Sequence, residues 1–62
     1  MRTFKPLVKI KNKWVEYPSL TIDKSIVFGE RQLKRNQTVA FKTESFGVTE
    51  ILTLEELKEV KL

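Results

Sequence analysis

Residues 9–17 read KIKNKWVEY, with apolar side chains at every second position on both sides of an Asn-Lys pair. This period-two pattern is typical of half-buried strands, and asparagine tolerates the left-handed conformation that a tight turn needs. The stretch therefore predicts a β-hairpin whose two loop residues are Asn12 and Lys13. One face of this hairpin carries Val8, Ile10, Val15 and Tyr17, and the other carries Lys9, Lys11, Trp14 and Glu16.

The predicted register places Trp14, the single tryptophan of the chain, opposite Lys11 on the basic face. Lysines neutralise phosphates and an exposed indole ring stacks on bases, and nucleic-acid binders without sequence preference combine these two elements. Packing is the alternative, because an amphipathic tryptophan can cover a sheet edge with a lysine over its ring. Both interpretations stay open on the sequence alone.

Strand-like segments continue beyond the hairpin. The alternating or short apolar stretches are SLTID (19–23), SIVF (25–28), TVAFKT (38–43) and VTEIL (48–52). Gly29 closes the second of them, and the polar, basic residues 29–37 predict a long loop or a ragged edge strand. In ESFG (44–47), Gly47 is expected to take the positive φ of a turn. The expected aromatic core consists of Phe4, Phe28, Phe41 and Phe46.

The character of the chain changes at LTLEELKEVKL (52–62). Thr53 and Glu56, three residues apart, form the pattern of a capping box, and Leu52 and Leu57 occupy the positions of a hydrophobic staple across it. Acidic residues in the first turn and lysines in the last turn suit the helix dipole. A helix is therefore predicted to begin at Leu54.

These elements predict a mostly β fold, a small antiparallel SH3-like barrel of about five strands with a short C-terminal helix, in one domain spanning residues 1–62. An α+β sheet with one packed helix is the alternative. From about Leu7 to Leu62 the pattern resembles the SH3-like barrel chromatin proteins of archaea, which bind DNA through a tryptophan-bearing sheet. The resemblance is one of overall pattern, and no residue role is carried over from it.

Composition excludes most catalytic chemistry. The 62 residues include neither cysteine nor histidine, so the chain offers no Ser-His or Cys-His nucleophile and no conventional transition-metal site. Neither glycine lies in a phosphate-binding pattern. We therefore expect no catalytic activity, no cofactor and no metal. The lysine-interrupted start lacks the apolar segment of a secretory signal, and no apolar run can span a membrane, so a cytoplasmic protein is expected.

Positive charge is concentrated in the first two thirds of the chain. Residues 1–42 hold ten basic and three acidic side chains, a net charge of +7, whereas residues 43–62 carry a net charge of −3. Such a basic segment indicates an acidic partner, and nucleic acid is the first candidate. The candidate binding residues are Lys9, Lys11, Lys13, Trp14, Arg31, Lys34 and Arg35.

A small protein-interaction module is the alternative function, for instance an inhibitor or accessory subunit of phage or mobile-element type that docks on an acidic protein. Small size adds a further expectation, because a 62-residue chain buries little apolar surface and an added interface is a common remedy. A homodimer could form through the strand around Val39 and Phe41, or through the helix with Leu54 and Leu57.

Overall fold

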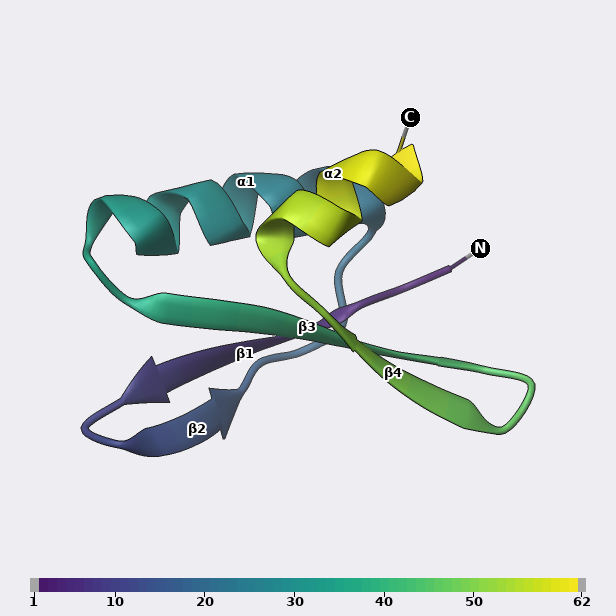
Figure 1. Ribbon diagram of the computed structural model, residues 1–62, viewed down its shortest axis with the longest axis horizontal. Coiled ribbons are helices and arrows are strands. Elements are labelled where there is room, and N and C mark those ends of the chain that lie inside the picture. The colour runs from purple at the N-terminus through teal and green to yellow at the C-terminus, as the bar shows by residue number, and fades with distance from the viewer. Residues whose placement is uncertain (1, 62) are drawn as a thin grey trace.

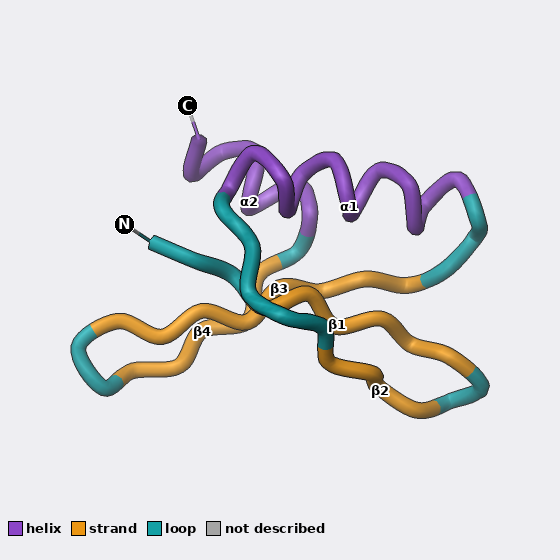
Figure 2. The backbone as a smooth tube through the Cα atoms, turned by 180° about the vertical axis from the view of Figure 1, so that it is seen from behind, coloured by secondary structure: helices purple, strands orange, loops and turns teal. Residues whose placement is uncertain are grey.

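Four strands form one antiparallel sheet in the order β2-β1-β3-β4. The computed structural model describes residues 2–61, so Met1 and Leu62, the ends of the predicted domain 1–62, lie outside the described residues. The strands are β1 (Lys5–Ile10), β2 (Lys13–Glu16), β3 (Thr38–Ser45) and β4 (Val48–Leu52). Two helices, α1 (Ile22–Lys34) and α2 (Leu54–Lys61), lie on one face of the sheet and leave the other face uncovered (Figure 1, Figure 2).

The predicted mostly β class is confirmed, since 42% of residues 2–61 are in strands or bridges and 35% are helical. The predicted barrel is wrong: the sheet stays open, and residues 2–61 contain four strands rather than five. Most of residues 19–37, predicted as strands and loop, form a helix instead. Two helices on one face bury that side of the sheet without closure, and the resemblance to SH3-like chromatin proteins is not confirmed.

The N-terminal hairpin forms with its turn one residue earlier than predicted. Lys11 and Asn12 make the turn with positive φ values of 49° and 65°, as a two-residue hairpin turn of type I′ requires. Lys13, predicted as a loop residue, begins β2. Lys9 therefore lies opposite Trp14, in place of the predicted Lys11. The partner of each β2 residue is thus two residues earlier in β1 than predicted. Because side chains alternate between the two faces with a period of two, a shift of two residues leaves every strand residue on its predicted face.

Helix α1 replaces two predicted strands. Ile22 and Ile26, four residues apart, pack against the core from one side of this helix. Asp23 in the first turn and basic residues in the last turn suit the helix dipole. A short apolar run such as residues 25–28 fits a buried strand or a helix equally well, and here the helical spacing of the surrounding residues prevails.

The C-terminal end of α1 is a Schellman motif. Asn36 has a left-handed φ of 58°. Its N–H donates to the Leu33 carbonyl at 3.0 Å, and the N–H of Gln37 donates to the Gln32 carbonyl at 3.0 Å. These two bonds satisfy carbonyl groups that the last turn of a helix otherwise leaves without partners. Residues 29–37 are therefore the end of a helix and its stop signal rather than a loop.

Gly29 lies in the middle of α1, not at the end of a strand. A Cβ atom at this position would lie 2.7 Å from Leu54 Cδ1 and 3.0 Å from Phe41 Cζ, closer than carbon atoms pack. Because residue 29 has no side chain, the helix approaches β3 and α2 this closely without displacing Leu54 or Phe41. The glycine serves packing here, although glycine in a sequence usually indicates a break.

The second hairpin and the C-terminal helix form as predicted. Phe46 and Gly47 make the turn between β3 and β4, with φ values of 51° and 77°. Thr53 and Glu56 form both hydrogen bonds of the capping box. The Thr53 N–H donates to Glu56 Oε1 at 3.0 Å, and the Glu56 N–H donates to Thr53 Oγ1 at 3.2 Å. Helix α2 begins at Leu54, which confirms the prediction.

The core lies between the sheet and the helices and is small. Its buried hydrophobic side chains are Phe4, Val8, Phe41, Leu54 and Leu57. Phe28 is partly buried against this cluster. Phe46 is 102% exposed, so the prediction that it belongs to the core is wrong. The β3–β4 turn that carries it extends beyond the helices, so neither helix covers it (Figure 1).

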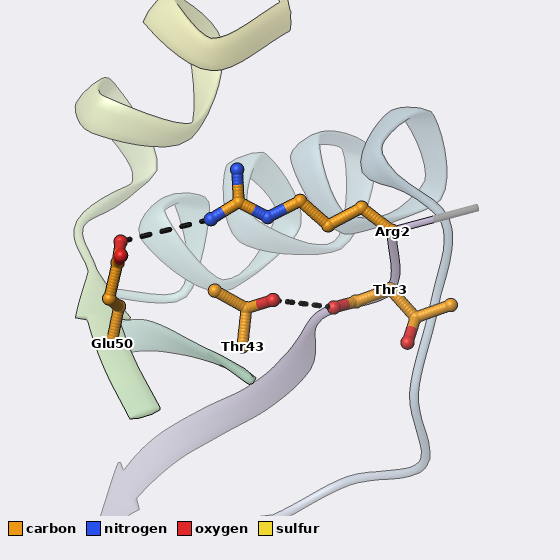
Figure 3. A network of polar contacts seen from close by, with 4 residues as sticks. All are labelled: Arg2, Thr3, Thr43 and Glu50. Atoms are coloured by element: carbon orange, nitrogen blue, oxygen red, sulfur yellow. Dashed lines mark hydrogen bonds and ion pairs between the residues drawn. The ribbon is translucent and has the colours of Figure 1, made fainter. Parts of the chain in front are cut away.

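Polar contacts hold the N-terminal segment to the sheet (Figure 3). The Thr43 hydroxyl donates a hydrogen bond to the Thr3 carbonyl at 3.0 Å, and Arg2 forms an ion pair with Glu50 at 3.7 Å. The backbone of Phe4 exchanges two hydrogen bonds of 2.9 Å with the segment before α1. The segment therefore links the entry of α1 to the two C-terminal strands.

Ser25 and Thr43 are both buried, but within residues 2–61 the Ser25 hydroxyl has no hydrogen-bond partner. A buried hydroxyl without a partner costs about 1–3 kcal/mol, and alanine is a better helix former than serine. We expect Ser25→Ala to raise the free energy of unfolding by about 1 kcal/mol, and Thr43→Val to lower it by about 1 kcal/mol. Urea denaturation measures both changes. A loss of stability in Ser25→Ala would contradict the unpaired hydroxyl.

Candidate nucleic-acid interface

The uncovered side of the sheet, called the open face here, carries the tryptophan. Because side chains alternate along each strand, the register defines which residues lie on this face. They include Leu7 and Lys9 of β1, Trp14 and Glu16 of β2, Ala40 and Lys42 of β3, and Ile51 of β4. Their neighbours along the strands, among them the buried Val8 and Phe41, face the helices.

A shallow depression of about 360 Å³ lies on the open face. All four strands contribute to its lining, which is formed by Leu7, Trp14, Glu16, Ala40, Lys42 and Ile51. Four of these six side chains are apolar and two are charged. The depression therefore offers an apolar surface to a flat ring, with a positive and a negative group beside it.

Trp14 is 51% exposed on this face. Lys9 Nζ lies 5.9 Å from the centre of the indole ring, within the range of a cation–π contact. The sequence predicts Lys11 for this contact, and the earlier turn puts Lys9 there instead. About half of the surface of Trp14 is thus accessible to a ligand.

Glu16 forms ion pairs with two of the lysines on the open face. Its carboxylate oxygens lie 3.2 Å from Lys5 Nζ and 3.9 Å from Lys42 Nζ. Lys9 forms no ion pair with any of residues 2–61. The positive charge of Lys9 next to Trp14 is therefore uncompensated, whereas the single carboxylate of Glu16 offsets one of the two charges of Lys5 and Lys42.

Lys11 and Lys13 are exposed at the tip of the hairpin. Lys11 lies in the turn, so the prediction that it shares a strand face with Trp14 is wrong; the earlier turn removes it from β1. Lys13 lies opposite Ile10 and belongs by alternation to the face that the helices cover. Lys11 therefore lies in the turn itself, and Lys13 lies next to it on the face opposite Trp14.

The second predicted cluster lies in the helical layer. Arg31 and Lys34 are in the last turn of α1, and Arg35 is its C-cap residue. Because α1 covers the face opposite Trp14, this cluster does not share the open face. The C-terminal end of α1 and the β1–β2 turn do lie at the same end of the molecule (Figure 1, Figure 2). We call this region the basic end, formed by Lys9, Lys11, Lys13, Arg31, Lys34 and Arg35.

Ion pairing distinguishes the basic end from the rest of the molecule. The cations that form ion pairs are Arg2, Lys5, Lys42, Lys58 and Lys61. Within residues 2–61, none of the six cations of the basic end forms one, and Lys24 is the only other described cation without one. The basic end therefore carries most of the uncompensated positive charge, which raises the local concentration of anions.

The apolar part of the open face is not predicted from the sequence. Leu7, Ala40 and Ile51 line the depression beside Trp14. Alternation with buried neighbours, such as Ala40 next to Phe41, indicates which residues of one strand share a face. The order of the strands brings these residues together. No local pattern specifies that β1 pairs with β3, because β2 and α1 separate the two strands in the sequence.

No family model matches the chain, and neither a curated protein nor a solved structure is significantly similar to it. Among residues 2–61, no helix is long and apolar enough to cross a membrane. In the same described residues, no group of three His, Cys, Asp or Glu side chains is placed to hold a metal ion. The open face and the basic end are therefore the features from which a function can be argued.

Proposed function

We propose that this protein is a non-catalytic module that binds nucleic acid without sequence preference through its open face and basic end. The position of Trp14 carries the proposal. Trp14 is half exposed, contacts Lys9, and follows Lys13 in β2 at the basic end, where none of the six cations forms an ion pair within residues 2–61. Binders of single strands combine a stacking platform with a positively charged surface in this way.

Lysines and tryptophan have different roles in the proposed mechanism. Lys9, Lys11 and Lys13 neutralise phosphates, and the release of condensed counterions from the nucleic acid drives binding. An unpaired base stacks on the exposed part of Trp14, beside the apolar depression. Bases within a duplex do not present their faces, so the ligand is single-stranded. The hairpin lysines bind the phosphate backbone of the nucleic acid, while the indole ring of Trp14 stacks on a base.

The cluster at the end of α1 adds cations to the basic end. Arg31, Lys34 and Arg35 lie in the other layer but at the same end of the molecule (Figure 2). A strand that continues past the hairpin tip meets these cations, which then add phosphate contacts without adding sequence preference.

An acidic protein is the second candidate ligand. The six uncompensated cations of the basic end fit an acidic protein surface by charge complementarity, as an inhibitor or accessory subunit would use them. The two functions differ in what they require of Trp14. Stacking on a base needs the face of the ring, whereas docking by charge does not.

Salt dependence tests the proposal most directly. We expect a labelled oligothymidine to bind at low salt, with a slope of log K against log salt between about −2 for the three hairpin lysines and about −4 for all six cations. Fluorescence anisotropy at several salt concentrations measures the slope. The absence of binding at low ionic strength would rule the proposed function out.

A matched pair of variants separates a defined interface from a net-charge effect. Replacing Lys9, Lys11 and Lys13 with glutamine should reduce the magnitude of the slope by about 2. Replacing Lys58 and Lys61 of α2, whose ammonium groups form ion pairs with Glu30 and Asp23 of α1, should change it by less than about 0.5. Equal losses per charge in the two variants would mean that net charge alone attracts the oligonucleotide.

A further inference from the structure

Strand β4 is an edge strand that lacks the protection of the opposite edge. β2, the other edge, has four residues, begins with Lys13 and is followed by Pro18, and these features oppose the addition of another strand. β4 has neither lysine nor proline, and the charge of Glu50 is paired with Arg2. Alternate backbone N–H and C=O groups of β4 point outward, where no strand of residues 2–61 lies.

Exposed apolar side chains gather on the same hairpin. The exposed fractions are 102% for Phe46, 58% for Val48 and 63% for Ile51. The turn between β3 and β4 extends beyond both helices in both views (Figure 1, Figure 2). An apolar edge with unpaired backbone groups is the surface on which a sheet accepts a further strand.

We propose that β4 pairs with β4 of a second copy of this chain, in antiparallel orientation across a two-fold axis. The axis is perpendicular to the sheet, because only this orientation makes the two β4 strands antiparallel neighbours in one sheet. The four strands of each copy then form a single continuous sheet, with the helices of both copies on the same side. The two open faces also become one surface.

The properties of the two edge strands favour a second copy of this chain as the partner of β4. Pairing of β4 with β4 uses the unprotected edge twice and leaves only β2 exposed, where Lys13 and the short strand oppose further addition. Assembly therefore stops at two copies. Pairing of β4 with β2 would leave an open edge at each step and produce a fibre. The small core adds a driving force, since only five hydrophobic side chains among residues 2–61 are buried.

The homodimer surfaces that the sequence suggests cannot form this interface. Val39 and Phe41 lie on β3, an internal strand that has β1 on one side and β4 on the other. Leu54 and Leu57 of α2 are buried in the core. Both sets of side chains hold the monomer together, so a dimer must use a different surface, and β4 supplies it.

Sedimentation equilibrium tests the dimer without any nucleic acid, so its outcome is independent of the proposed function. The mass of the unmodified protein is expected to rise with concentration from 7.3 kDa toward twice that value. Val48→Lys puts a lysine at the interface twice per dimer and is expected to weaken dimerisation about tenfold or more. Val15→Lys, the same change on the exposed β2 edge, is the matched control and should leave dimerisation unchanged.

Two outcomes overturn the proposal. One is a mass that stays at 7.3 kDa over the whole concentration range. The other is an equal effect of the two lysine substitutions. Circular dichroism establishes that the variants fold. If Val48→Lys does not fold, amide exchange of the unmodified protein decides: exchange in β4 should slow as the concentration rises, and exchange that is independent of concentration overturns the dimer.

Discussion

Phe41→Ala is expected to unfold a large part of the protein population. Phe41 is fully buried on β3, where the end of its ring lies against Gly29 of α1. Truncation of a buried phenylalanine costs about 3–5 kcal/mol. A chain of this length has a total stability of about 3–9 kcal/mol. We therefore expect a fall of about 15–30 °C in the midpoint of thermal unfolding, measured by circular dichroism.

Phe46→Ala is the matched control for this change. The same side chain is removed five residues along the chain, but Phe46 is fully exposed at the turn. Its truncation should change the free energy of unfolding by no more than about 0.5 kcal/mol. The comparison is made at concentrations at which the chain is monomeric, because Phe46 borders the proposed dimer edge. Equal destabilisation by the two changes would contradict the position of the core.

Local signals account for what the sequence predicts correctly. The capping box of Thr53 and Glu56 and the turn glycine Gly47 both act within four residues, so their patterns specify their conformations directly. Alternation in the first hairpin assigns Trp14 to the correct face even though the turn is displaced. A displacement of the pairing by two residues keeps the faces, because the side-chain period is two.

Helix α1 could not be recognised in the same way, because its decisive signal is not local. Gly29 looks like the end of a strand, yet its role is to admit Leu54 and Phe41, which are distant in the sequence. The stop signal at Asn36 was present but looked like part of a polar loop. Once these residues were assigned to strands, the number of strands and the barrel followed, so one wrong element changed the whole predicted fold.

In the candidate site, too, one part follows from local sequence signals and the other part depends on the fold. Lys9 and Trp14 belong to one hairpin, and their contact follows from a local pairing. The position of Arg31 and its neighbours relative to Trp14 depends on how α1 lies across the sheet. The sequence could suggest that both clusters bind one ligand, but only the fold places them at one end and on opposite layers (Figure 1).

Trp14→Ala is expected to weaken the binding of a single-stranded oligonucleotide about 5–150-fold, because stacking of one base on an aromatic ring contributes about 1–3 kcal/mol. The salt dependence should stay unchanged, since no phosphate contact is removed. Trp14→Phe retains a stacking face and should restore part of the affinity. The fold should tolerate both changes at a cost of about 1–2 kcal/mol, because half of the ring is already exposed.

Trp14 also provides the measurement, since the intrinsic fluorescence of the chain comes mainly from its single tryptophan. Stacking of a base should quench this emission when a single strand is added, and a duplex at equal phosphate concentration should quench it less. Anisotropy titrations of Trp14→Ala and Trp14→Phe then give the affinities. Undiminished affinity in Trp14→Ala, together with a large fall in melting temperature, would make Trp14 a packing residue and the open face no part of the interface. Equal affinity of the unmodified protein and Trp14→Ala for an acidic protein, with no binding of either to the oligonucleotide, would favour the protein-interaction module instead, because docking by charge does not need the ring.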